Sequence, residues 1–251
     1  MGGHSHWSQI KRQKGSSDVK RGALFTKLSR EITVAAREGG GDPDMNPRLR
    51  LAIEKAREGN MPADTIDRAV KRGSGAEGDA VQLQEARFEG YGPNGVAIMV
   101  DALTDNRNRT VAELRTALTR GGGSLGETGC VGWLFDSRGV LTIPIDTHDP
   151  DELALASIDA GAADVEVVGE QVEVYTAPTE LDRVRKALLE QGIPVQSAEL
   201  TALPKSSVAL DDKTAGQVLR LLDTLEDLDD IQHVYSNADF PEAVLLDYAG
   251  R

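Results

Sequence analysis

The fold class can be argued from residues 140–200, which read VLTIPIDTHDPDELALASIDAGAADVEVVGEQVEVYTAPTELDRVRKALLEQGIPVQSAEL. Short runs rich in β-branched residues alternate in this stretch with segments of helical length and periodicity. Strands are expected at Val140–Ile145, Val165–Val168, Gln171–Tyr175 and Ile193–Leu200, and helices at Pro150–Ala160 and Thr179–Gln191. This order, βαββαβ, is that of the ferredoxin-like split unit.

The sequence on both sides of this unit supplies the elements of a second α/β domain. The flanking strands are expected at Val81–Tyr91, Val96–Leu103, Val131–Asp136 and Ile231–Ser236, and the helices from Thr110 (with Glu113 completing a capping box) and at Lys213–Leu225. The first and last strands of a ferredoxin-like unit are neighbours, so such a unit can be inserted into another domain. We therefore expect a split ferredoxin-like middle domain at residues 79–137 and 204–251, and an inserted ferredoxin-like domain at residues 138–203.

The residues ahead of the middle domain predict three short helices. Apolar residues recur at helical spacing from Val19 onward. Asn46-Pro47 supplies an N-cap and a first-turn proline for the second helix, and Met61-Pro62 opens the third. The predicted fold class is therefore α+β: a basic arm with an N-terminal three-helix domain (residues 1–78), followed by two ferredoxin-like α/β domains, one inserted in the other.

Charge is segregated along the chain. The stretch His4–Arg37 holds eight Lys/Arg against two acids, a balance of 8 − 2 = +6, although the protein as a whole carries −13. Residues 1–78 sum to 15 − 10 = +5 and the remainder to 13 − 31 = −18. A basic segment on an acidic protein favours a polyanionic partner, and any nucleic-acid surface is expected in the N-terminal third.

The cations of the predicted first helix lie apart from its apolar residues. With about 100° per residue, the apolar stripe contains Leu24, Leu28, Ile32 and Ala35, and the cationic face contains Lys20, Lys27, Arg30 and Arg37. We expect the cationic face in solvent, next to an aperiodic arm that carries further cations and an indole for base stacking. The candidate contacts are Trp7, Lys11, Arg12, Lys14, Lys20, Arg21, Lys27, Arg30 and Arg37. The alternative is an ordinary solvated helix face.

The polar loop Leu103–Thr110 contains two further candidates for phosphate contact, Arg107 and Arg109. Helix capping by Asn108 or Thr110 is the competing explanation for this loop.

Several other classes of protein are disfavoured by the sequence. No run approaches the roughly 18 apolar residues of a membrane span, and no signal-peptide region is present, so we expect a cytoplasmic protein with no membrane partner. Cys130 is the single cysteine, and the four histidines show no metal-binding spacing. The stretch Gly121–Thr128 approaches a phosphate-binding loop, but Glu127 replaces its lysine. No catalytic arrangement of nucleophile and base stands out, so we expect no enzyme.

Several motifs together resemble the YebC/PmpR family over essentially the full chain. They are Gly3-His4-Ser5-His6-Trp7, Phe25-Thr26-Lys27-Leu28, Asn46-Pro47-Arg48-Leu49-Arg50, Asn60-Met61-Pro62, Glu89-Gly90-Tyr91-Gly92-Pro93 and Leu103–Thr110. His6 departs from the family pattern, which has lysine there. The resemblance implies a cytoplasmic three-domain protein without a cofactor. Family members are described as DNA-binding transcriptional regulators, a mitochondrial relative as a translational activator of cytochrome oxidase, and bacterial relatives are linked to ribosomes stalled on proline-rich sequences.

Two functions therefore stay open, both of them regulation of gene expression through nucleic acid. The first is a DNA-binding transcriptional regulator, and the second is a ribosome-associated translation factor that binds ribosomal RNA and relieves stalling at proline-rich sequences. The chain shows no helix-turn-helix with base-reading side chains and no dimer signal, so we expect a monomer. A basic arm with one tryptophan suits RNA as well as duplex DNA. A protein-interaction adaptor is the third alternative, and it needs no basic arm.

Overall fold

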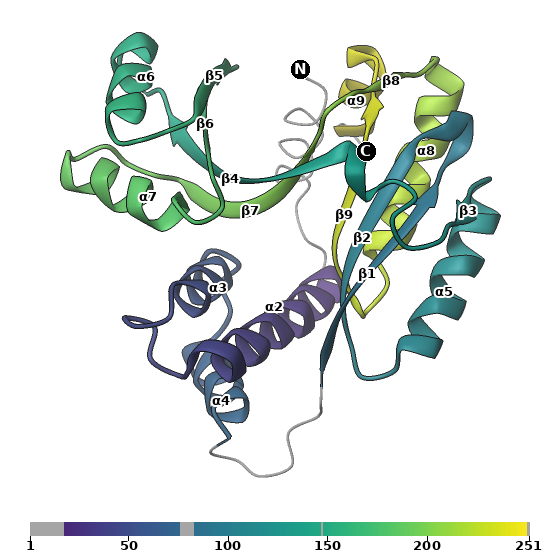
Figure 1. Ribbon diagram of the computed structural model, residues 1–251, viewed down its shortest axis with the longest axis horizontal. Helices are drawn as coiled ribbons and strands as arrows, with labels where there is room; N and C mark the ends of the chain where they lie inside the picture. The colour runs from purple at the N-terminus through teal and green to yellow at the C-terminus, as the bar shows by residue number, and fades with distance from the viewer. Residues whose placement is uncertain (1–17, 76–82, 147, 250–251) are drawn as a thin grey trace. The chain divides into compact units, whose positions relative to one another are not determined.

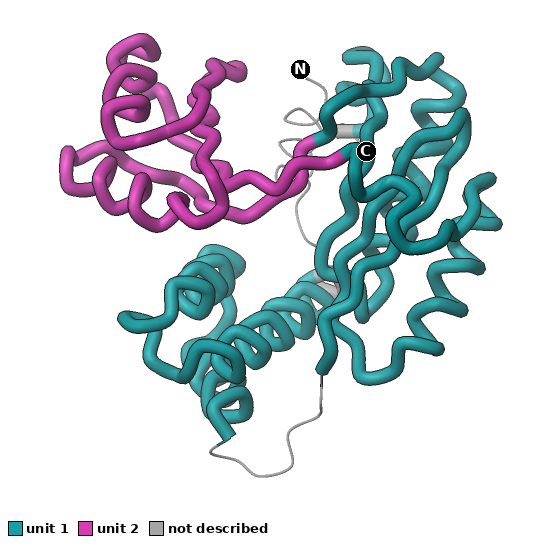
Figure 2. The backbone as a smooth tube through the Cα atoms, in the orientation of Figure 1, with its two compact units in different colours: residues 1, 3–134, 204–251 teal, residues 2, 135–203 magenta. Residues whose placement is uncertain are grey.

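The chain divides into two compact units, which Figure 2 shows in different colours. The structure is a computed structural model that describes residues 18–75, 83–146 and 148–249. Of these residues, unit 1 contains 18–75, 83–134 and 204–249, and unit 2 contains 135–146 and 148–203. Both combine helices with antiparallel sheets, so the predicted α+β class is confirmed. The finer three-domain division stays a prediction.

Three helices form the N-terminal part of unit 1 (Figure 1): α2 at Asp18–Gly39, α3 at Pro47–Glu58 and α4 at Ala63–Gly73. The side chain of Asn46 caps α3 by accepting a hydrogen bond from the Leu49 N–H, as the sequence predicts. The helices bury one shared apolar cluster, which includes Leu28, Ile32, Leu49, Ile53, Met61 and Ile66. On another side of α2, Val34 packs with Leu83 and Leu103 of the neighbouring sheet region.

A four-stranded antiparallel sheet of order β3-β1-β2-β9 forms the rest of the core of unit 1. Its strands are β1 at Gln84–Tyr91, β2 at Ala97–Thr104, β3 at Ser124–Leu125 and β9 at Ile231–Ser236, and its helices are α5 at Arg107–Arg120 and α8 at Asp212–Glu226. Both helices contribute to one apolar cluster with the strands, for example through Leu118, Leu222 and Ile98. The tightly turned segment Pro93–Gly95 joins β1 to β2. Short strands β8 (Val208–Ala209) and β10 (Ala238–Asp239) pair in parallel, and α9 (Glu242–Ala249) follows them.

Unit 2 has a four-stranded sheet of order β5-β6-β4-β7 with two helices. Its elements are β4 at Phe135–Pro144, α6 at Pro150–Asp159, β5 at Asp164–Val168, β6 at Gln171–Thr176, α7 at Leu181–Glu190 and β7 at Ser197–Pro204. The two central strands pair antiparallel, with Leu141 opposite Val174 and Ile143 opposite Val172. The chain order βαββαβ and this strand order are those of the ferredoxin-like split unit expected from the sequence.

The strand predicted at Val131–Asp136 is wrong. Residues Gly132–Leu134 form a single 3-10 turn, β4 begins only at Phe135, and the third strand of the unit 1 sheet is the two-residue β3. The apolar run resembles a strand, but the buried carboxylate of Glu89 captures the N–H groups of Val131 and Gly132 that a strand would have paired.

The packing of α4 on α2 can be tested at Gly73. A Cβ added at Gly73 would lie 2.2 Å from the Thr33 main-chain oxygen and 2.8 Å from the Ala36 Cβ. We expect Gly73→Ala to destabilise unit 1 by about 1–3 kcal/mol, because backbone atoms of α2 must move. Urea unfolding followed by circular dichroism measures the change.

Gly22→Ala is the matched control, because a Cβ there meets nothing within 4 Å on an exposed turn of α2. Its helix propensity should raise stability by up to about 1 kcal/mol. Equal effects of the two substitutions would contradict the close packing of α4 on α2.

Candidate nucleic-acid interface

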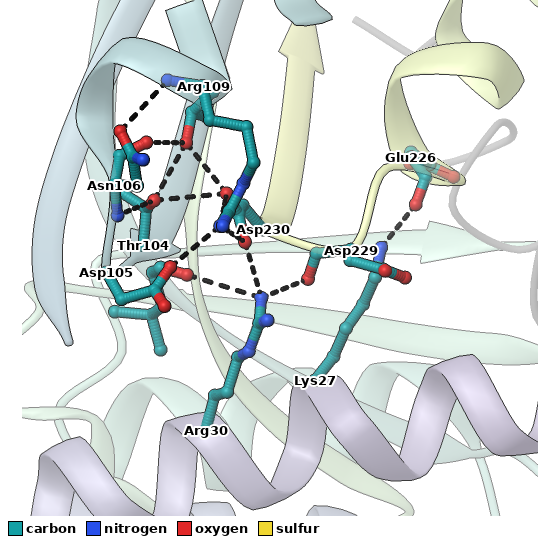
Figure 3. A network of polar contacts seen from close by, with 11 residues as sticks. Lys27, Arg30, Thr104, Asp105, Asn106, Arg109, Glu226, Asp229 and Asp230 are labelled. Atoms are coloured by element: carbon teal, nitrogen blue, oxygen red, sulfur yellow. Dashed lines mark hydrogen bonds and ion pairs between the residues drawn. The ribbon is translucent and has the colours of Figure 1, made fainter. Parts of the chain in front are cut away.

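Two cations of α2 are bonded to the turn between α8 and β9 (Figure 3). Lys27 Nζ donates to the main-chain oxygen of Glu226. Arg30 Nη1 donates to the main-chain oxygen of Asp229 at 2.5 Å and to Oδ1 of Asp230 at 2.9 Å. The structure differs here from the expectation that this face lies in solvent, because an acidic turn distant in sequence supplies its acceptors.

Asp230 is the carboxylate at the centre of these contacts, and its side chain is 2% exposed. Arg30 reaches Oδ1, and Arg109 Nη2 lies 2.9 Å from Oδ1 and 2.7 Å from Oδ2. The hydroxyl groups of Thr104 and Thr110 lie 3.0 Å and 2.7 Å from Oδ2. One buried acid therefore joins α2, the end of β2 and the first turn of α5.

These donors decide the charge state of Asp230. Burial by itself would raise the pKa of this carboxyl, but the hydrogen bonds from Arg109, Thr110 and Thr104 outweigh it and hold the pKa below its ordinary value. The carboxylate is therefore ionised at neutral pH and fully engaged with its donors.

The two arginines of the loop before α5 have different surroundings. Arg109 also pairs with Asp105 at 2.7 Å, so its guanidinium bridges an exposed and a buried carboxylate. The guanidinium carbon of Arg107 lies over the Phe88 ring, 5.2 Å from its centroid, and Arg107 is exposed. Of the two secondary candidates, Arg107 is the one that faces solvent without a carboxylate partner among the described residues.

The predicted cap of α5 is also corrected. Asn106 is the N-cap and accepts from the Arg109 N–H at 3.2 Å, in place of Asn108 or Thr110. Thr110 is completely buried, and its hydroxyl donates to the Asp230 carboxylate. We call Asp230 with its four partners Arg30, Thr104, Arg109 and Thr110 the Asp230 cluster.

A separate set of cations lies where the ends of α2 and α4 meet. Gly73 packs on the last turns of α2. A Cβ added at Gly41, after the end of α2, would lie 3.2 Å from the Cβ of Ser74, after the end of α4. Arg37, Lys71 and Arg72 are exposed there, and no hydrogen bond or ion pair holds their side chains among the residues that the structure describes. We call these three residues the helix-end cluster.

The remaining predicted contacts lie in the first turn of α2 or precede this helix in the sequence. Arg21 is exposed on its first turn, and Lys20 lies within the helix. Trp7, Lys11, Arg12 and Lys14 lie outside the described residues. The structure therefore brings Lys27, Arg30 and Arg109 together at one acidic turn, and it places Arg37 elsewhere.

Sequence reasoning missed Asp230, and it named Arg37 as a contact without showing that Lys71 and Arg72 lie at the same helix ends. The acidic run before β9 resembles any solvated turn, and nothing local marks one of its members as buried. The sequence has Arg68, Lys71 and Arg72 in the predicted third helix, but only the packing of α4 on α2 shows that the end of this helix lies near Arg37.

Neither a metal site nor a membrane-spanning helix is found in the part of the chain that the structure describes. No group of three or more His, Cys, Asp or Glu side chains is arranged to hold a metal ion among those residues. None of the described helices combines the length and the apolar character needed to cross a membrane.

The comparisons with known proteins indicate the same family over nearly the whole chain. Residues 5–76 match the family model described as the TACO1/YebC protein N-terminal domain, and residues 83–238 match the TACO1/YebC second and third domain. Proteins named "Probable transcriptional regulatory protein" from Herpetosiphon aurantiacus and Rubrobacter xylanophilus are 53% and 52% identical over 250 residues, covering 99% and 100% of both chains. The crystal structure of a conserved hypothetical protein from Aquifex aeolicus is similar with a TM-score of 0.85 and 47% identity, over 94% of this chain and 98% of that one.

The Asp230 cluster predicts a measurable stability effect. Asp230→Asn should cost about 3 kcal/mol at neutral pH, because two guanidinium groups are then left without their buried charge partner. A depressed pKa stabilises the fold above the carboxyl's unfolded pKa of about 4, and this stability is lost as the pH falls through the folded pKa. The difference between wild type and variant in urea unfolding should therefore shrink towards pH 3.

Asp105→Asn is the control, since Asp105 pairs with the same Arg109 but is 45% exposed. Its effect should stay within about 0.5 kcal/mol at all pH values. A cost for Asp230→Asn that is no larger than that of the control would refute the stabilising role of the Asp230 contacts.

Proposed function

Because the chain belongs to the TACO1/YebC family, we propose that it regulates gene expression by binding nucleic acid, as a DNA-binding transcriptional regulator. Its relatives carry the name of transcriptional regulatory proteins, which supports regulation at the level of the family. The observation that carries the proposal is the helix-end cluster: three exposed cations at adjoining helix ends of an otherwise acidic protein.

Charge placement supports binding by the N-terminal third. The protein carries −13, yet residues 1–78 sum to 15 − 10 = +5. A polyanion would be repelled by most of the surface and attracted to this part, which orients the encounter. Lys27 and Arg30 already have acceptors in the acidic turn, so the contacts are assigned to the helix-end cluster and the arm.

The contacts are to phosphate rather than to base edges. α3 and α4 follow each other across a short turn, as the helices of a helix-turn-helix do, but α4 exposes Asp64 and Asp67 in its first two turns. The first turns of a recognition helix enter the major groove, and carboxylates there would be repelled by the backbone. Phosphate contacts fix position and carry no sequence information directly.

The exposed carboxylates in the first two turns of α4 favour a second candidate. The protein would then be a ribosome-associated translation factor that contacts ribosomal RNA through the same cations and relieves stalling at proline-rich sequences. RNA is recognised largely by shape, backbone contact and stacking on unpaired bases, for which the arm residue Trp7 is suited. In either role we propose a cytoplasmic monomer that is not an enzyme.

Competition between the two ligands distinguishes the two roles. The purified protein is sedimented with ribosomes at physiological salt while promoter DNA is added in excess. Retention on ribosomes would support the translation factor. Transfer to one promoter fragment, but not to scrambled DNA, would support direct transcriptional control. Binding to neither would refute the proposal and favour a protein-interaction adaptor.

The helix-end cluster gives the proposal a structural test. The triple variant Arg37→Glu, Lys71→Glu, Arg72→Glu should bind duplex DNA of about 30 base pairs at least tenfold more weakly at 0.1 M salt. The slope of log K against log salt should fall by about 0.9 for each DNA phosphate that the variant no longer neutralises, or by about 0.7 for each phosphate of a single strand. Fluorescence anisotropy over a series of salt concentrations measures both quantities.

The matched control reverses three exposed cations of α5 and α8: Arg115→Glu, Lys213→Glu and Arg220→Glu. Net charge changes equally in the two triples, so general repulsion is the same. Equal weakening by both triples would sink the assignment of the helix-end cluster as a contact surface.

A further inference from the structure

Two exposed aromatic side chains are tied to the same main-chain oxygen of unit 1. Tyr91 Oη and Trp133 Nε1 each donate to the Cys130 oxygen at 3.2 Å. Trp133 is 67% exposed and Tyr91 is 38% exposed. Their polar atoms are thus satisfied within the protein, while much of the surface of both rings faces solvent. Exposed aromatic groups held in this way are typical of binding surfaces.

The loop that carries Trp133 is held by the buried side chain of Glu89. Its carboxylate accepts from the N–H groups of Gly129 at 2.8 Å, Val131 at 2.7 Å and Gly132 at 2.6 Å. Burial would raise the pKa of the Glu89 carboxyl, but these three hydrogen bonds outweigh it and lower the pKa. The carboxylate therefore stays ionised, and the loop on both sides of Cys130 is fixed before any ligand arrives.

Preorganisation of this kind favours stacking. A ligand that lies on Trp133 does not have to immobilise the indole, because the indole N–H bond and the Glu89 contacts already do so. Flat, unpaired nucleobases gain free energy from such rings irrespective of their sequence.

Cations lie near the aromatic pair. Lys205 Nζ donates to the Trp133 main-chain oxygen at 3.0 Å, which places an ammonium group at the main chain of this residue. Arg120, exposed at the end of α5, precedes the glycine turn that packs on Tyr91, where a Cβ at Gly123 would lie 2.2 Å from the Tyr91 oxygen. Glu127 is an exposed acid of the same loop and the ionised Glu89 is a buried one, so two cations stand against two acids.

We propose that Tyr91 and Trp133 form a stacking platform for unpaired nucleobases of a single-stranded segment, with Lys205 and Arg120 near its phosphates. The proposal rests on the nucleic-acid binding proposed above and adds to it a second contact region, in unit 1 but away from the N-terminal helices. Duplex nucleic acid, whose bases are already stacked, would not occupy the platform.

The fluorescence of Trp133 reports directly on a ligand that stacks on its indole. The chain has two tryptophans, so all measurements use a Trp7→Phe background in which Trp133 is the sole indole. An oligouridylate of about 12 nucleotides should quench its fluorescence on binding, whereas an abasic strand of the same length should not. Anisotropy of the labelled strand measures affinity independently of the indole.

The variants separate stacking from structure. Trp133→Ala and Tyr91→Ala should each weaken oligouridylate binding about tenfold and leave duplex binding unchanged. Trp133→Phe should restore most of the affinity, because a smaller ring still stacks. Met45→Ala is the control, since Met45 is 80% exposed and lies in the connection between α2 and α3. Urea midpoints close to that of the Trp7→Phe parent show that each variant is folded.

The outcomes are distinct. Bound oligouridylate with no quenching and with unchanged affinity in Trp133→Ala would overturn the platform and leave the proposed function standing. Quenching by a proline-rich peptide, but by no oligonucleotide, would assign the aromatic pair to a peptide instead. Failure of every nucleic acid to bind the intact chain would overturn the proposed function together with the platform.

Discussion

The buried carboxylate of Asp230 is the constraint on which the arrangement of unit 1 depends. It is reached by Arg30 from α2 and by Arg109 from α5, and the two hydroxyl groups of Thr104 and Thr110 complete its surroundings. A carboxylate with so little exposure is stable only while its charge is matched by donors. The position of α2 on the sheet and the start of α5 are therefore coupled through one side chain.

This coupling changes how the basic residues of α2 should be understood. A helical projection treats all cations of one face alike, but the structure divides them into two groups. Lys27 and Arg30 balance acceptors of the protein itself, so their charge holds the fold together. Arg37 joins Lys71 and Arg72 at the ends of two helices, where the exposed charges remain available to an external polyanion.

Local features of the sequence predicted much of the fold and less of the site. Periodicity and the Asn46 cap located α3, and alternating segments in residues 140–200 located the inserted unit, because these signals act between near neighbours. The Arg30–Asp230 contact spans 200 positions, and no local pattern distinguishes a cation that will be paired from one that will not. The error at Val131–Asp136 has the same origin, since Glu89 diverts the N–H groups of Val131 and Gly132 from 42 and 43 positions away.

Asp230 and Glu89 show how an acidic protein can shape a surface with buried charge. Each carboxylate has a lowered pKa because donors surround it. Asp230 pairs with two guanidinium groups, whereas Glu89 binds main-chain N–H groups and leaves the Trp133 side chain of its loop exposed. A buried acid that accepts from main-chain N–H groups can therefore hold a loop whose aromatic side chain is exposed. A buried acid satisfied by arginines instead gives those guanidinium groups an acceptor within the protein, so the interior determines which cations are paired.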